Sequence, residues 1–197
     1  ASNPTNSLRK ISLMIAGAQK AGTTSLKNYL GQHPEVQSHH HKEFAFFVDD
    51  ADFVQGYPLA KRKYFHPAKS SPTVIAKSAG LYINEKALMR LKEHNPECKL
   101  VIILRNPVER TYSSYLMEKN YGAITEPFEI ISDIIQKADR NDWRYEFFIG
   151  MSLYSKKLEL IYKYFSKDHV RIVRYEDFSS DPKSVCQSIF TWIGVDG

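Results

Sequence analysis

A glycine-containing loop with a lysine inside it follows the first apolar run of the chain. The loop spans 17–24 and reads GAQKAGTT. Glycines at this spacing let backbone N–H groups and the start of a helix surround phosphate oxygens. In the common triphosphate-binding loop a lysine directly follows the second glycine, but here Thr23 takes that place and Lys20 lies within the loop. The pattern favours one phosphate and its leaving group over a triphosphate, with a plain structural turn as the alternative.

A second anion-binding pattern follows the strongest apolar run, KLVIIL at 99–104. Arg105 comes directly after this run, and Ser113 lies about two helical turns further along the chain. A guanidinium fork and a hydroxyl can together bind a second phosphate. Taken alone, the segment is equally typical of a surface helix that is capped by Asn106.

The order of apolar segments predicts the elements that position these residues. Strands are expected at 11–16, 73–77, 99–104 and 169–175, and helices at 23–33, 85–93, 107–119 and 153–165. Alternating strands and helices indicate an α/β fold with a central, largely parallel β-sheet that helices cover. The segment 44–71 is expected to be mostly loop and short helix. Ligands of such sheets bind beyond the carboxyl ends of strands, just after Ala16, Lys77 and Leu104.

The composition indicates one globular domain. The chain has 197 residues, and 27 Lys and Arg against 22 Asp and Glu give a formal charge of +5. This surplus is too small to indicate nucleic-acid binding, although it suits an anionic ligand. No stretch approaches the roughly 20 apolar residues that a membrane span requires. We therefore expect no nucleic-acid partner and no membrane span in this chain.

Metal and thiol chemistry are not expected. Cys98 and Cys186 are too few for a disulfide framework or a thiolate metal site, so they are predicted to be plain thiols. His39, His40 and His41 are consecutive, and three adjacent rings rarely face one ion. The sequence therefore predicts no metal site.

Four stretches together resemble the sulfotransferase family that uses 3′-phosphoadenosine-5′-phosphosulfate as its sulfuryl donor. They are GAQKAGTTSL at 17–26, KEFAFF at 42–47, AKSAGLY at 76–82 and LRNPVERTYSSY at 104–115. RIVRYEDFSSDP at 171–182 adds a weaker match to a late strand and acidic turn. The chain is most similar to the heparan-sulfate-type, carbohydrate-modifying branch and its bacterial relatives. The resemblance implies a P-loop-like three-layer fold.

The resemblance also implies which residues bind the donor. The 5′-phosphosulfate would be bound by Lys20, Gly22, Thr23 and Thr24, with Gly17 serving the turn. The 3′-phosphate, which distinguishes this donor from ATP, would be bound by Arg105 and Ser113.

Two further residues are implied to act on the reacting groups. Glu43 matches the glutamate that deprotonates the acceptor, and Lys77 matches the lysine that follows the next strand and approaches the reacting centre. Sulfuryl transfer resembles phosphoryl transfer, so alignment and charge stabilisation dominate. Lys20 and Lys77 supply positive charge, and an ionised Glu43 can accept a proton without any metal. His41 is the alternative base, because some branches of the family use histidine.

The expected function is therefore sulfuryl transfer to a hydroxyl or amine of an acceptor, and the resemblance implies that this acceptor is a carbohydrate. The alternatives are a P-loop nucleotide kinase or NTPase with a displaced lysine, and a non-catalytic nucleotide-binding domain. We expect one domain over 1–197 that lacks the C-terminal part of the family domain. The run KRK at 61–63 is predicted to be a solvated face, with contact to a sulfated or carboxylated glycan as the alternative. A cytoplasmic location is favoured, and the Golgi lumen is the alternative.

Overall fold

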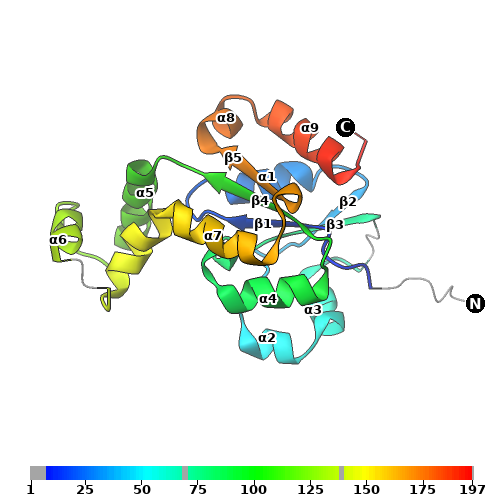
Figure 1. The fold of residues 1–197 in the computed structure, drawn as a ribbon, viewed down its shortest axis with the longest axis horizontal. Coiled ribbons are helices and arrows are strands. Elements are labelled where there is room, and N and C mark those ends of the chain that lie inside the picture. Colours follow the sequence, from blue (N-terminus) through cyan, green and yellow to red (C-terminus); the bar gives the residue numbers. More distant parts are fainter. Residues whose placement is uncertain (1–7, 68–70, 138–139, 197) are drawn as a thin grey trace, which may run out of the picture.

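A five-stranded parallel sheet forms the centre of the molecule. The computed structural model describes residues 8–67, 71–137 and 140–196. The strand order is β2-β3-β1-β4-β5, and every neighbouring pair is parallel (Figure 1). The strands are β1 (Leu13–Gly17), β2 (Val36–Ser38), β3 (Thr73–Lys77), β4 (Lys99–Leu104) and β5 (Val170–Arg174).

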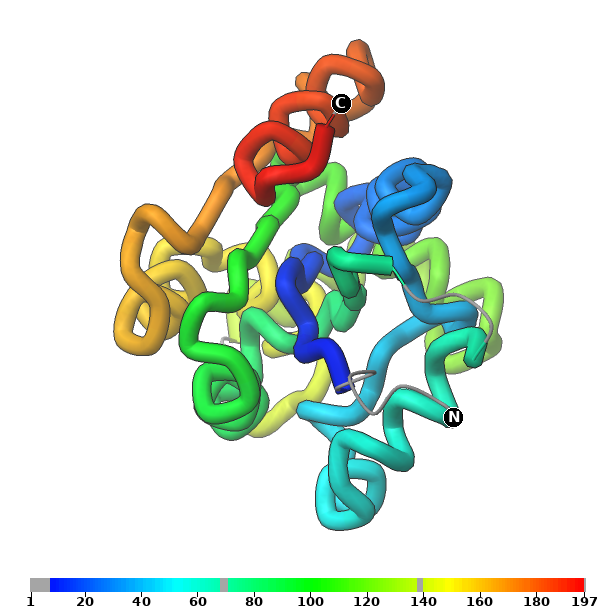
Figure 2. The backbone as a smooth tube through the Cα atoms, turned by 90° about the vertical axis from the view of Figure 1, so that its right-hand side faces the viewer, coloured from blue at the N-terminus to red at the C-terminus, as the bar shows by residue number. Residues whose placement is uncertain are grey.

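Helices cover both faces of this sheet. One face carries α1 (Thr23–Leu30), α8 (Tyr175–Ser180) and α9 (Pro182–Ile193), and the other carries α2 (Asp50–Val54), α3 (Tyr57–Tyr64), α4 (Glu85–His94) and α7 (Tyr154–Tyr164). Figure 2 shows β1 in dark blue near the middle, with α9 above it and α4 below it. The three layers confirm the predicted fold class. At one end of the molecule stand α5 (Pro107–Asn120) and α6 (Ile130–Lys137).

The two most apolar strands are buried because helices pack on both of their faces. All five residues of β1 are buried, and so are the four central residues of β4. Continuous apolar runs are typical of strands at the centre of a parallel sheet. This is why β1 and β4 were predictable from composition alone.

The four predicted strands and four predicted helices are present, with ends shifted by a few residues. The sequence reasoning missed two further helices, α6 of 8 residues and α9 of 12 residues. The segment 44–71 contains the two short helices α2 and α3, as expected. The acidic turn expected after the last strand is instead the short helix α8, which Pro182 at the start of α9 follows closely. The edge strand β2 was not predicted, because three residues are too few to display a period.

The parallel arrangement brings the carboxyl ends of three strands to one edge of the sheet. Ile15 on β1 pairs with Lys77 on β3, and Gly17 pairs with Ile102 on β4. The segments that follow Gly17, Lys77 and Leu104 therefore begin side by side, as the sequence predicts.

A buried arginine fastens α5 to the segment that precedes α7. The side chain of Arg110 is fully buried and donates to the carbonyl oxygens of Phe147 and Phe148 and to Ser152 Oγ. Burial lowers the pKa of this guanidinium. Its hydrogen bonds to oxygens compensate for the water that it loses. The contact fixes the direction of α5, whose first turns carry the second anion-binding pattern.

Two smaller findings complete the description. Both cysteines are buried free thiols, as predicted. Within the described ranges, every helix is too short or too polar to cross a bilayer.

We predict that replacing Gly17 with Ala destabilises the fold by about 1–3 kcal/mol, the usual range for overpacking. A Cβ at this position would lie 2.5 Å from Cδ1 of Tyr82, whose ring is buried and whose hydroxyl donates to the Met151 carbonyl. Urea unfolding measures the effect. Gly80→Ala is the matched control, because a Cβ there meets no atom within 4 Å. Equal stability of the two variants would contradict the steric argument.

Candidate functional site

A cavity of about 280 Å³ opens at the edge where these strands end. We call it the lysine cavity. Every predicted site residue lines it except Gly17 and Arg105. Its lining consists of Gln19, Lys20, Gly22, Thr23, Thr24, Lys42, Glu43, Lys77, Ala79, Ser113, Met117 and Tyr175.

The loop between β1 and α1 reaches this cavity through two residues with left-handed backbones. Lys20 has a φ of 69° and Gly22 a φ of 82°. This conformation is unfavourable for a lysine, and such outliers gather at ligand sites. Gly22 also needs to be small, because an added Cβ would press within 3.4 Å of the rings of Phe178 and Tyr175. The turn directs the N-terminus of α1 at the cavity, where free N–H groups favour an anion.

Lys20 lies among other cations. Its pKa is lowered from the ordinary value first by burial and then by Lys42 and Arg105. Both neighbours repel its charged form, so the group lacks a compensating negative charge. A bound phosphate or sulfate would supply that charge. This concentration of positive charge is why the residues suit an anionic ligand.

Arg105 lies beside the cavity and does not line it. Its Nη1 donates to the carbonyl oxygen of Lys20 at 3.2 Å, and its Nε donates to Glu109 at 3.2 Å. The guanidinium also lies over the ring of Tyr175, 4.6 Å from its centroid. Ser113, the other half of the predicted pair, lines the cavity directly. The structure therefore brings the two predicted anion-binding patterns to one place.

Lys77 connects the start of α1 to Glu43. Its Nζ donates to Glu43 Oε1 at 2.6 Å and to Thr24 Oγ1 at 3.1 Å. The second carboxylate oxygen accepts from the backbone N–H of Ala79 at 2.9 Å. The lysine side chain is only 1% exposed, whereas that of Glu43 is 41% exposed. The carboxylate is thus held by two donors and still open to the cavity.

A buried lysine that the sequence reasoning missed supports the backbone before Glu43. Lys27 Nζ donates to the carbonyl oxygens of His39 and His41 at 3.2 and 3.1 Å. Its pKa is lowered mainly by burial and next by Lys77. His39 Nε2 in turn accepts from the backbone N–H of Lys77 at 3.0 Å. The segment 39–43 is therefore attached both to α1 and to the end of β3.

Five lining residues were not predicted as site residues, and three of them, Gln19, Lys42 and Tyr175, carry polar groups. Gln19 lies inside the glycine loop, Lys42 is the first residue of KEFAFF, and Tyr175 directly follows β5. Their nearness to recognised motifs and to a strand end is the signal that could have indicated them.

The three consecutive histidines do not face one point: the rings of His40 and His41 pack together with centroids 4.7 Å apart, away from the buried His39. His39 is buried, and the ring of His41 packs against that of Tyr64 with centroids 4.8 Å apart. His41 does not line the lysine cavity. Within the part of the chain that the structure describes, no three His, Cys, Asp or Glu side chains are grouped to hold a metal ion.

A second cavity, of about 510 Å³, adjoins the first and shares Gln19, Glu43 and Ala79 with it. We call it the acidic cavity. Its lining consists of Gln19, Glu43, Val48, Ser78, Ala79, Gly80, Ile83, Asn84, Glu85 and Met151. Glu43 therefore lies on the boundary between the two cavities.

We predict that His39 makes stability fall in acid. Burial, together with Lys27 and Lys77, lowers the pKa of His39 from 6.5 to about 3. Between these two pH values His39 binds a proton in the unfolded chain and not in the folded chain, so the free energy of unfolding decreases as pH falls. The slope from this group approaches about 1.4 kcal/mol per pH unit, and its contribution is complete above about pH 6.5.

Urea unfolding from pH 7 down to pH 4 measures this slope. In His39→Gln an amide oxygen can accept from the Lys77 N–H without titrating. The free energy of unfolding should therefore fall less steeply with decreasing pH, by the contribution of one bound proton. An unchanged slope in the variant would assign the acid sensitivity to other groups.

Comparison with known proteins agrees with this geometry. The model of the sulfotransferase domain matches residues 10–196. Bifunctional heparan sulfate N-deacetylase/N-sulfotransferase 1 of Caenorhabditis briggsae is 24% identical over 194 residues, which cover 93% of this chain and 22% of that protein. Heparan sulfate glucosamine 3-O-sulfotransferase 5 of Mus musculus is 27% identical over 188 residues, covering 92% of this chain and 53% of that protein. The chain thus spans about a fifth and about half of these relatives.

Solved structures share the fold. A sulfotransferase from Alicyclobacillus acidocaldarius has a TM-score of 0.81 at 24% identity, covering 95% of this chain and 82% of the other. Mouse sulfotransferase SULT7A1, complexed with PAP, has a TM-score of 0.56 at 12% identity, covering 96% of this chain and 60% of the other. Because the family model extends over nearly the whole chain, the resemblance seen in the sequence is confirmed: the chain belongs to the sulfotransferase domain family.

Proposed function

We propose that the chain transfers a sulfuryl group from 3′-phosphoadenosine-5′-phosphosulfate to a hydroxyl or amine of a carbohydrate acceptor. One observation carries the proposal. Lys20, Lys42 and Lys77 gather around a held, exposed carboxylate at the N-terminus of a helix. Cations and free N–H groups suit a phosphosulfate, and a carboxylate suits deprotonation of the attacking group. The carbohydrate acceptor is inferred from the heparan sulfate relatives.

Donor binding is assigned to the two anion-binding patterns. Lys20, Thr23 and Thr24 would bind the 5′-phosphosulfate at the start of α1. Ser113 and Arg105 would bind the 3′-phosphate, Ser113 from the cavity wall and Arg105 from its place over the Tyr175 ring. The mouse enzyme with the same fold contains PAP, the 3′,5′-bisphosphate that such a donor leaves behind. The assignment needs Arg105 to turn from Glu109 toward the nucleotide.

The chemistry then depends on alignment and charge. Glu43 would accept the proton of the acceptor hydroxyl or amine as that group attacks the sulfur in line with the leaving phosphate. Lys20 neutralises charge that develops on this phosphate. Lys77 already contacts both Thr24 and Glu43, so it stands between donor and base and can stabilise the sulfuryl oxygens.

Glu43 is preferred over His41 as the base for a geometric reason. Glu43 lines both cavities, so its carboxylate can face the donor on one side and an acceptor on the other. The His41 ring contacts Tyr64 instead, outside the lining of either cavity.

We predict that the protein binds PAP at least tenfold more tightly than AMP, because only PAP carries the 3′-phosphate. Calorimetric titration with each nucleotide measures both affinities. Ser113→Ala should weaken PAP binding by about tenfold or more, the value of a hydrogen bond to a charged group, and leave AMP binding nearly unchanged. Ser132→Ala, on the exposed surface of α6, is the control. Equal affinities for PAP and AMP in the wild type would refute the donor assignment, and tighter binding of ATP would favour a kinase.

We predict that Glu43→Gln lowers the rate of transfer by about 10²-fold or more while PAP affinity stays within a few-fold. The amide keeps the shape of the side chain but is not a base, and loss of a general base has an effect of this size. Turnover with labelled donor, compared with PAP titration, measures the two quantities. Glu93→Gln on the exposed surface of α4 is the control. Unchanged turnover in Glu43→Gln, with loss in His41→Gln, would move the base to His41.

A further inference from the structure

We propose that the acidic cavity binds an acceptor sugar that is uncharged and rich in hydroxyl groups near the reacting position. Glu85 and Gln19 would select this acceptor and exclude carboxylated or sulfated sugars. The inference rests on the proposed sulfuryl transfer, because it takes Glu43 as the boundary between donor and acceptor. It goes beyond that function by naming the charge of the acceptor.

The two cavities on either side of Glu43 differ in charge. The lysine cavity is lined by three lysines and one glutamate. In the acidic cavity the charged lining residues are Glu43 and Glu85, both acidic. Each of these carboxylates is already paired with a lysine, Glu43 with Lys77 and Glu85 with Lys163. A carboxylate or sulfate in this cavity would have to compete with them for those lysines, which is costly in a partly desolvated site.

Two of the lining groups that remain available are hydrogen-bond acceptors. The Oε1 atom of Gln19 is buried and has no hydrogen-bond partner among the described residues. In Glu85, Oε1 accepts from Lys163 Nζ and Tyr164 OH, both at 2.6 Å, and the other oxygen carries no such contact in the described part of the chain. A ligand can satisfy these oxygen atoms by donating hydrogen bonds to them, and sugar hydroxyls are hydrogen-bond donors. An orphaned acceptor such as Gln19 Oε1 is costly unless a ligand or water satisfies it.

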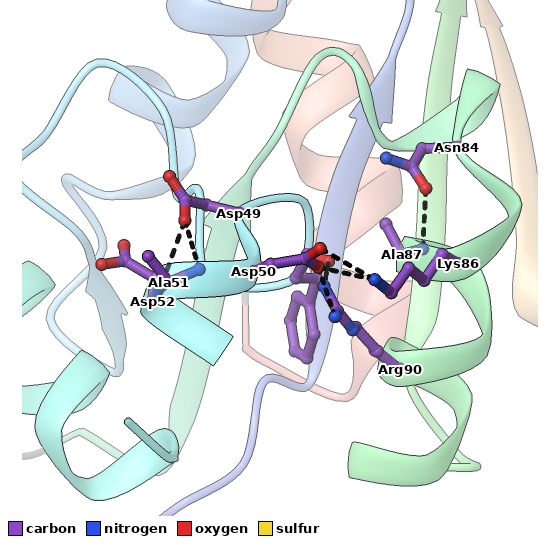
Figure 3. Close-up of polar contacts among 9 residues, drawn as sticks. Asp49, Asp50, Ala51, Asp52, Asn84, Lys86, Ala87 and Arg90 are labelled. Carbon is purple, nitrogen blue, oxygen red and sulfur yellow. Dashed lines mark hydrogen bonds and ion pairs between the residues drawn. The ribbon is translucent and has the colours of Figure 1, made fainter. Parts of the chain in front are cut away.

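Cations on α4 and α7, close in sequence or space to Glu85, are also bound to carboxylates. Figure 3 shows Lys86 and Arg90 of α4 directed at Asp50, with N–O distances of 2.5 to 2.9 Å. Lys163 is bound to Glu85 itself. Recruiting Lys163 to an anionic acceptor would remove the cation from Glu85, and recruiting Lys86 or Arg90 would leave Asp50 with one of its two cations.

Asn84 and two lysines of the 61–63 run are also engaged in hydrogen bonds. The oxygen of Asn84 caps α4 by accepting from the Ala87 N–H at 3.0 Å, so its NH₂ group is the part left for a ligand (Figure 3). Within the 61–63 run, Lys63 binds Asp52 and Lys61 binds Gln37, which does not favour the alternative that this run contacts a charged glycan.

The size and the apolar part of the cavity also suit a sugar. Its volume of about 510 Å³ is within the usual range of small-molecule sites. Val48, Ile83 and Met151 add apolar surface against which the C–H face of a sugar ring can pack. Ala79 and Gly80 leave the wall beside Glu43 free of bulk.

Matched tetrasaccharides test the proposal with the donor present. One contains only N-acetylglucosamine, and the other alternates N-acetylglucosamine with glucuronic acid. We expect kcat/KM for labelled sulfate transfer to be at least tenfold higher with the uncharged acceptor. Equal or higher kcat/KM with the glucuronic acid acceptor would overturn the acceptor assignment and leave the transferase function intact. Failure to bind PAP would overturn the transferase function itself.

Charge reversal tests the role of Glu85. Glu85→Lys should shift the ratio of kcat/KM values by at least tenfold toward the glucuronic acid acceptor. Glu85→Gln, which keeps hydrogen-bonding atoms for Lys163 and Tyr164, should shift the ratio in the same direction by less. Glu93→Lys makes the same charge change on the exposed surface of the same helix and should leave the ratio unchanged.

Thermal unfolding and PAP titration show whether each variant is folded with its donor site intact. If the Glu85 variants bind PAP as the wild type does and keep the wild-type ratio, Glu85 does not select the acceptor and the proposal is wrong. If Glu85→Lys does not fold, Glu85→Gln decides in the same way.

Discussion

The buried ammonium group of Lys77 connects the parts of the site. It stands at the end of β3, where its backbone N–H is fixed by His39 and its Nζ bridges Thr24 of α1 and the Glu43 carboxylate. A lysine that is 1% exposed requires such partners, because an unpaired buried charge is strongly unfavourable. The same requirement positions the carboxylate beside the glycine loop. The ion pair that satisfies the buried lysine thus also places Glu43 where the proposed base would act.

Glu43 also divides two environments of opposite charge. On one side the helix N-terminus and the lysines of the lysine cavity suit an anion, and on the other the acidic cavity offers hydrogen-bond acceptors. The proposed in-line transfer requires donor, base and acceptor to lie side by side in this order. The charge difference would also oppose binding of the proposed acceptor in the place of the donor. Family membership alone does not determine this difference, because it depends on residues such as Glu85 outside the recognised motifs.

Two buried cations hold backbone segments around the site. Lys27 binds the carbonyl oxygens of the segment before Glu43, and Arg110 binds those of the segment before α7. Both are buried cations on helices that begin at the site edge of the sheet. These hydrogen bonds hold the two segments in addition to apolar packing such as that of Phe148, because each lost hydrogen bond would leave a buried charge unsatisfied.

The sequence by itself determined the β1 and β4 strands, the glycine loop and the α/β class, because continuous apolar runs and glycine spacing are local properties. It also indicated most lining residues of the lysine cavity through their motifs. The tertiary structure decided that Arg105 lies over Tyr175 beside the cavity, that Lys27 supports the Glu43 segment, and that Glu85 lines the acidic cavity. These contacts join residues far apart in the chain. Their geometry follows from packing, which no local pattern encodes.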